Sequence, residues 1–299
     1  MAHTSPKVLT VENSAYPENL RTVPDQPSLF CDGDLLPTDR AAVAIVGTRR
    51  ATSLGKEVAY EMARDLAKAG MTVVSGLAEG IDAAAHRGAL DAGGRTIACL
   101  GAGIDVIYPK SNRNLYARIP EKGALVSEYP VGSEPLPWHF PARNRIISGL
   151  SLGVLVVEAG EKSGALITAD WAAKHGRPVM AVPGSVRSRA SVGSNRLIQD
   201  GAYLACSAQD VLSFLRHETE YVPESVSVPQ VCLTLEEAFV LEEVPDDVFS
   251  VEEALTRVPS YAAGRLLSVL SSLEVKGVLR RVPGGKYMLT GASVTDPNQ

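Results

Sequence analysis

The residues best suited to chemistry lie in loops that follow short apolar segments. Residues 47–55 read Gly-Thr-Arg-Arg-Ala-Thr-Ser-Leu-Gly and lead into an expected helix. Glycines, small hydroxyl residues and a helix N-terminus bind anions through backbone N–H groups, and arginines add planar donors that suit phosphate. The G-x-G-x-x-G and Walker A patterns are absent. This loop predicts phosphate binding through Gly47, Thr48, Arg49 and Arg50; the alternative is a tight turn with solvated arginines.

Similar loops follow the next expected strands. Ser75 and Gly76 begin a glycine-rich turn that leads to Asp82 and His86, which share one helix face because they are four residues apart. We favour a structural role for this pair, with Asp82 as a helix cap and His86 as a hydrogen-bonded group, over acid–base catalysis. Lys110 follows the third strand, and it is either a phosphate contact or a surface lysine.

The most distinctive segment is residues 137–145, Pro-Trp-His-Phe-Pro-Ala-Arg-Asn-Arg, in a chain with only 5% aromatic residues. Aromatic rings interleaved with cations are typical of single-strand binding, where stacking contributes about 1–3 kcal/mol per base. The candidate contacts are Phe140, Arg143, Asn144 and Arg145. In the alternative, Phe140 belongs to the core and the arginines pair with Glu128 or Glu158. Ser163 and Gly164, at the start of a later helix, offer a further backbone anion site.

Other kinds of site find little support. The five histidines form no cluster with metal-ligand spacing, and no Cys–His arrangement presents itself. We therefore expect no metal, no cofactor and no catalytic residue. Four widely spaced cysteines suggest reduced thiols. The chain shows no signal peptide and no apolar run of the ~18 residues that would span a bilayer, so we expect a cytoplasmic location without membrane contact.

Short apolar segments alternate with helical segments between residues 41 and 220. Strands are expected at 42–46, 71–75, 96–100, 124–127, 154–158 and 178–182. Helices are expected at 54–69, 82–92, 112–122, 166–175, 194–200 and 208–216. Continuous apolar strands alternating with helices predict an α/β fold, an extended Rossmann-like doubly wound, mostly parallel sheet. Ligands of such sheets bind beyond the carboxyl ends of the strands, where the loops above lie.

The remaining chain differs in kind. Residues 1–40 are a short N-terminal lead-in, residues 221–231 a linker with Pro223 and Pro229, and residues 291–299 a tail. Residues 232–290 contain expected helices at 235–243, 251–257 and 262–275 and a hairpin over 278–289. This order predicts a small C-terminal winged-helix domain. Five basic residues between 265 and 286 would support duplex contact, whereas the acidic residues of 236–253 argue against a broad duplex surface.

The net charge of −5 and the isoelectric point near 5.6 argue against nucleic acid as a partner. The charge is uneven, however. Residues 1–40 carry 3 basic and 6 acidic side chains, residues 41–215 carry 19 and 15, and residues 216–299 carry 7 and 13. A mildly basic centre thus lies between acidic flanks, which predicts a local phosphate-lined pocket instead of a cationic coat.

Taken together, the motifs resemble the bacterial DNA-processing protein A family (DprA, also called Smf). The matching strings, over about residues 16–210, are Gly47-Thr48-Arg49, the S-G-L-A-x-G-I-D-x-x-A-H of 75–86, Tyr108-Pro109, the S-E-Y-P of 127–130, the F-P-x-R-N-R-I-I of 140–147, the S-G-x-L-I-T of 163–168 and the V-P-G of 182–184. The resemblance implies a homodimer that binds single-stranded DNA without catalysis. It also implies a recombination mediator that protects incoming DNA and loads RecA during natural transformation.

By position, the resemblance assigns phosphate contact to Arg49, backbone contact to Lys110, and the strand path to Phe140, Arg143 and Arg145. Ser163 and Gly164 would line the same pocket. Two features depart from the family: the first 40 residues are too short for the N-terminal helical domain of many relatives, and Trp138 has no family role. The alternative function is a nucleotide-processing hydrolase of the related phosphoribohydrolase type. Its P-G-G-x-G-T-x-x-E loop is not matched, because Pro183-Gly184 is followed by Ser-Val-Arg.

Overall fold

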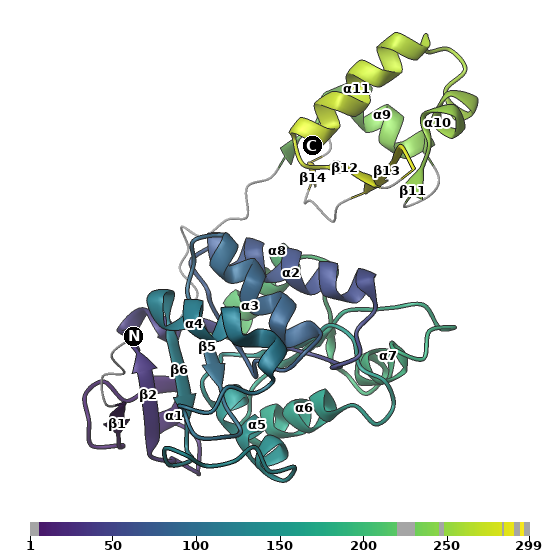
Figure 1. The fold of residues 1–299 in the computed structure, drawn as a ribbon. Helices are drawn as coiled ribbons and strands as arrows, with labels where there is room; N and C mark the ends of the chain where they lie inside the picture. Colours follow the sequence, from purple (N-terminus) through teal and green to yellow (C-terminus); the bar gives the residue numbers. More distant parts are fainter. Residues whose placement is uncertain (1–5, 220–230, 245–247, 283, 290–293, 296–299) are drawn as a thin grey trace. The chain divides into compact units, whose positions relative to one another are not determined.

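The computed structural model describes residues 6–219, 231–244, 248–282, 284–289 and 294–295 (Figure 1). The chain divides near residue 226 into two compact units, and each is described by itself. Most of the predicted linker lies outside the described residues. So does the predicted tail, apart from residues 294–295. Among the described residues, none of the helices combines the length and apolar composition that a bilayer crossing requires.

A nine-stranded sheet in the order β1-β2-β6-β5-β4-β3-β7-β8-β9 forms the centre of the first unit. Its strands are β1 (Lys7–Leu9), β2 (Leu29–Gly33), β3 (Ala42–Val46), β4 (Thr72–Ser75), β5 (Thr96–Cys99), β6 (Ala124–Ser127), β7 (Val154–Val156), β8 (Val179–Ala181) and β9 (Tyr203–Leu204). In this order, all neighbouring strands from β6 to β9 run parallel to one another. Strand β1 pairs with β2, and β2 with β6, in antiparallel orientation. The predicted α/β fold with a mostly parallel sheet is confirmed.

Helices cover both faces of this sheet, with α2, α3 and α8 on one side and α5 and α6 on the other (Figure 1). The helices are α1 (Glu18–Arg21), α2 (Ser53–Lys68), α3 (Ile81–Asp91), α4 (Arg113–Lys122), α5 (His139–Gly149), α6 (Gly164–Lys174), α7 (Val192–Gln199) and α8 (Ala208–Glu218). Short 3-10 helices, η1 and η2, span 37–40 and 110–112. Successive strand residues point to opposite faces: Ile97 and Cys99 pack with α5 and α6, and Ala98 packs with α3 and α4. Both faces are apolar, which explains the continuous apolar segments.

The structure adds elements that the sequence pattern did not indicate. Strands β1 and β2 extend the sheet beyond β6, so the predicted lead-in contributes to the same unit. Strand β9 has only two residues, which is too short for a hydrophobic pattern to reveal a strand.

The sequence pattern does not indicate helix α5, because the buried side of this helix includes two polar residues, Arg143 and Asn144. The apolar spacing that is usual for a helix is therefore missing. Pro141 lies in its first turn, where a backbone N–H has no helical partner in any case.

The described residues of the second unit form three helices, a three-stranded antiparallel sheet in the order β11-β13-β12, and a parallel pair of short strands, β10 and β14. Its elements are β10 (Val231–Cys232), α9 (Leu235–Glu243), β11 (Val248–Phe249), α10 (Val251–Arg257), α11 (Ala263–Val275), β12 (Leu279–Val282), β13 (Lys286–Leu289) and β14 (Val294–Thr295). Val240, Phe249, Leu266, Leu270 and Leu273 are buried in its core. The helices and the hairpin follow the expected order. The winged-helix assignment itself stays a prediction.

Candidate nucleic-acid interface

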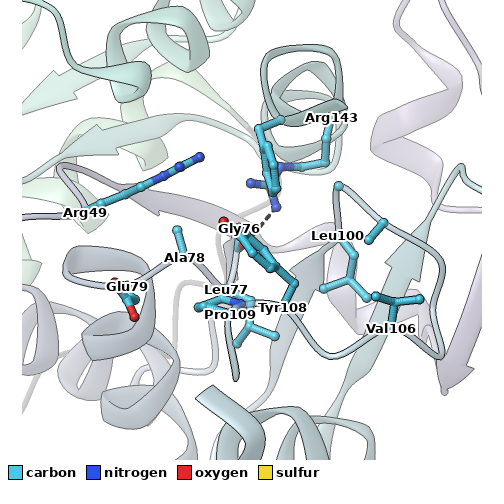
Figure 2. Close-up of a pocket in the computed structure, with 13 residues that line it drawn as sticks. Arg49, Gly76, Leu77, Ala78, Glu79, Leu100, Val106, Tyr108, Pro109 and Arg143 are labelled. Carbon is cyan, nitrogen blue, oxygen red and sulfur yellow. Dashed lines mark hydrogen bonds between the residues drawn. The ribbon is translucent and has the colours of Figure 1, made fainter. Parts of the chain in front are cut away.

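A groove of about 520 Å³ lies at the carboxyl ends of the parallel strands, where the loop after β3 meets the starts of α5 and α6. A smaller pocket of about 160 Å³ adjoins it, and the two share Arg49, Ala78, Tyr108, Phe140 and Arg143. Predicted site residues that line the groove are Gly47, Thr48, Arg49, Arg50, Phe140, Arg143, Asn144, Ser163 and Gly164. Gly76 lines the smaller pocket (Figure 2). Loops far apart in the sequence thus form one site.

Arg49 and Phe140 form the boundary between the two cavities. The Arg49 guanidinium lies 5.0 Å from the centroid of the Phe140 ring, and that ring lies 5.4 Å from the ring of Tyr108. Arg49 is exposed and Phe140 is half-buried, so Phe140 lines both cavities and does not belong to the core. A cation above an aromatic ring at this distance is an attractive contact. It places a cation that suits phosphate beside an aromatic ring that lines both cavities.

Arg143 lines the groove, yet it is only 3% exposed. Its Nη1 donates to the carbonyl oxygen of Gly76 at 2.7 Å (Figure 2), and it also donates to that of Cys99. The Asp82 carboxylate beside it accepts from the N–H groups of Gly76 and Ala78 at 3.2 and 3.4 Å. Burial raises the pKa of Asp82, and the charge of Arg143 opposes that rise. Arg143 and Asp82 therefore hold the loop after β4 and the end of β5 in place.

Three predicted residues lie outside the lining of both cavities. Arg145 forms ion pairs with Glu128, at 2.6 Å, and with Asp25. The pair with Glu128 agrees with the alternative interpretation, in which the arginines of this segment pair with acidic residues. Side chains two positions apart in a helix point in directions that differ by about 200°. Arg143 and Arg145 therefore face opposite sides of α5. Ser75 is fully buried and donates to the carbonyl oxygen of Ile45 at 2.6 Å. Lys110 is exposed at the start of η2, next to Pro109 at the rim of the smaller pocket.

The N-terminus of α2 already holds an anion from the protein itself. The buried Glu158 carboxylate accepts from the N–H of Thr52 at 2.9 Å and from its hydroxyl at 2.6 Å. Thr52 in turn caps the helix by accepting from the N–H of Gly55. A phosphate at this helix end would meet a carboxylate. The anion-binding capacity of the loop therefore rests on the side chains of Arg49 and Arg50.

The N-terminus of α6, by contrast, opens into the groove. Ser163 and Gly164 line it, and the Ser163 hydroxyl accepts from the N–H of Ala165 at 3.3 Å. Lys162, which we did not predict, is exposed and lines the same wall. Its position directly before the Ser-Gly pair that begins a helix was the available signal. Cations thus stand on both sides of the groove.

Asp82 and His86 are both buried, and their contacts are structural. The cap position of α3 is Gly80, so Asp82 is not the helix cap that we expected. The Thr96 hydroxyl donates to the carbonyl of Val73 at 2.7 Å and lies 2.7 Å from His86 Nδ1, so Nδ1 is the donor in that contact. His86 Nε2 has no partner among the described residues. Burial lowers the pKa of His86 to about 3.

This buried imidazole predicts sensitivity to acid. Below its ordinary pKa of 6.5, His86 takes up a proton in the unfolded chain but not in the folded protein, so the free energy of unfolding falls as the pH decreases toward about 3. One pKa unit corresponds to about 1.4 kcal/mol. The variant His86→Gln has a side chain that does not titrate but can still form a hydrogen bond with Thr96. Between pH 7 and pH 5, we expect its free energy of unfolding, measured with urea, to decrease by about 2 kcal/mol less than that of the wild type. Equal losses would contradict this account of the imidazole.

Comparison with known proteins identifies the family. A family model described as DNA recombination-mediator protein A matches residues 7–216. Protein Smf of Escherichia coli is 37% identical over 292 residues, which cover 95% of this chain and 78% of that protein. DNA processing protein DprA of Streptococcus pneumoniae is 45% identical over 205 residues, 68% of this chain and 72% of the relative.

Solved structures agree with this result. The crystal structure of DNA processing protein A from Streptococcus pneumoniae has a TM-score of 0.67 at 44% identity and covers 70% of this chain and 74% of that one. The protein from Helicobacter pylori, described with a single-stranded DNA binding mode, has a TM-score of 0.63 at 34% identity and covers 71% of this chain and 97% of that one. The family match extends over every loop and helix that lines the groove, and the chain belongs to the DNA recombination-mediator protein A family.

Proposed function

We propose that this protein binds single-stranded DNA in the groove and acts there as a recombination mediator. In this proposal it protects incoming strands and loads RecA onto them during natural transformation, as a cytoplasmic homodimer and without catalysis. The Arg49–Phe140 pair in the groove is the observation that carries the DNA-binding part of the proposal. Family membership supports the role in recombination. Lys110, at the rim of the smaller pocket, is a candidate backbone contact.

The chemistry of the groove suits an unpaired strand. A base can stack on a half-buried ring such as Phe140 only when it is not enclosed in a duplex. Arg49 and Arg50 on one side and Lys162 with the N-terminus of α6 on the other can contact phosphates. Few cations are involved, which agrees with the mild charge of the central residues. The groove therefore combines a stacking surface with a short row of phosphate contacts.

The second unit offers less to a duplex than its sequence suggested. Arg265, Lys276 and Arg281 pair with Glu236, Glu237 and Glu274 at 2.6, 2.6 and 3.1 Å. Lys286 lies 4.0 Å from Glu253. Carboxylates of the same unit thus offset much of its basic charge. We infer that single-strand affinity resides in the first unit.

Fluorescence anisotropy with labelled oligonucleotides tests the proposal. The whole chain and a truncation ending at residue 219 are titrated with a single strand and with its duplex over 50–300 mM salt. We expect both proteins to bind the single strand with affinities within about threefold of each other, and the logarithm of the affinity to fall linearly with the logarithm of the salt concentration. Tighter binding of the duplex, or loss of single-strand binding on truncation, would refute the proposal.

A further inference from the structure

Trp138 is an exposed aromatic residue that the groove does not use. It is 65% exposed, more than Tyr108, Phe239 or Tyr203. Its neighbours in the sequence line the groove, since Pro135, Pro137, Phe140 and Pro141 all belong to that lining. Trp138 itself is not among the lining residues. The ring therefore lies on the segment that forms the rim of the groove, but outside the cavity.

The side chain of Trp138 packs against other rings at its base. Its ring meets His139 edge-on, with centroids 6.1 Å apart. His139 stacks on Tyr129 at 3.8 Å, and its Nδ1 lies 3.2 Å from the carbonyl oxygen of Gly101. The backbone of Trp138 is helical, at the cap of α5. These contacts hold a large apolar surface at the rim of the groove, facing solvent.

The positions of Trp138 and Phe140 determine what each ring can reach. Side chains two residues apart at the start of a helix are rotated by about 200°. Phe140 lines the groove, so Trp138 faces the other flank of the 135–141 segment. A strand that leaves the groove across this segment passes from one ring toward the other. Because every base has a π-face, such a surface accepts any base by stacking.

We propose that Trp138 is a second stacking platform, which binds a base of the same single strand just outside the groove. The inference rests on the proposed function, since it requires that the groove hold single-stranded DNA. It adds a stacking contact outside the groove to the contacts that the groove itself offers. The groove sets the phosphate contacts, and Trp138 extends the length of strand that the protein grips.

Trp171 provides a matched control because it is the other of only two tryptophans. It is half-buried on α6 and contacts Lys174, whose Nζ lies 4.6 Å from the ring centroid, and His175. It lines neither cavity. In a Trp171→Phe protein, the intrinsic tryptophan fluorescence comes from Trp138 alone.

The test combines two readouts on oligothymidylates of increasing length. Anisotropy of a labelled strand reports binding, and emission of the Trp171→Phe protein reports Trp138. We expect long strands to quench the emission, and Trp138→Ala to weaken their binding by about tenfold. The shortest strands that bind, which fill only the groove, should bind Trp138→Ala and wild type equally. Trp138→Phe should retain most of the affinity, and Trp171→Phe all of it.

Three results would overturn the proposal, and they differ from one another. Long strands that bind by anisotropy without changing Trp138 emission, and equally well to Trp138→Ala, would reject the platform and leave the proposed function intact. Absence of binding by any strand would reject the proposed function and the platform together. An emission change that follows protein concentration and not the oligonucleotide would assign Trp138 to a contact between copies of the chain.

Discussion

Replacing Arg143 with methionine is expected to lower the free energy of unfolding by about 3–5 kcal/mol, because two buried carbonyl oxygens lose their donor and the buried Asp82 carboxylate loses a stabilising positive charge. Asp82 would remain buried beside an apolar side chain, and the carbonyl oxygens of Gly76 and Cys99 would lose their donor. The loop after β4 and the end of β5 would no longer be held against α5. Single-strand binding should therefore fall as well, as a consequence of the lost structure.

Urea unfolding at pH 7 measures the free energy of unfolding of Arg143→Met. Two further variants separate the possible causes of its decrease. Arg49→Met makes the same chemical change at an exposed residue of the groove, and it should alter the free energy of unfolding by no more than about 0.5 kcal/mol. Arg143→Met with Asp82→Asn removes the unpaired charge and should recover part of the loss. If Arg143→Met were as stable as wild type but bound DNA poorly, Arg143 would be a direct DNA contact, as the sequence suggested.

Replacing the exposed cations of the groove should abolish most single-strand binding without unfolding the protein. The variant carries Arg49→Met, Arg50→Met and Lys162→Met. Each phosphate contact on a single strand contributes about 0.7 to the slope of log affinity against log salt, so the slope should decrease by about 2. At 0.15 M salt the same relation predicts a loss of about 50-fold. Anisotropy over a salt series measures both quantities.

A control variant with the same change in net charge separates local contacts from the overall field. Lys68, Arg87 and Lys122 are exposed on α2, α3 and α4 and line neither cavity. Their replacement by methionine should leave the slope unchanged and weaken binding by less than about threefold, because exposed charges that do not contact the strand are screened at this salt, where the Debye length is about 8 Å. Equal losses in the two variants would show that the groove is not the binding site.

The sequence alone predicted the fold class and the edge of the sheet at which the candidate groove lies. Strands at 42–46 and 124–127 have the bounds that were predicted, because a strand buried on both faces must be apolar throughout. The parallel order then placed the loops after the strands at one edge of the sheet. The family followed from motifs in those same loops, and the comparisons confirmed it.

Only the tertiary structure decided which of the candidate side chains are available to a ligand. The Glu158 carboxylate occupies the N-terminus of α2 from a position 106 residues away from Thr52, and no local pattern contains that contact. The sequence treats Arg143 and Arg145 alike, yet the rotation of α5 directs Arg143 onto backbone carbonyls and Arg145 onto Glu128. The type of a residue determines which contacts its side chain can make. Whether those contacts are already satisfied depends on groups that folding brings from distant parts of the chain.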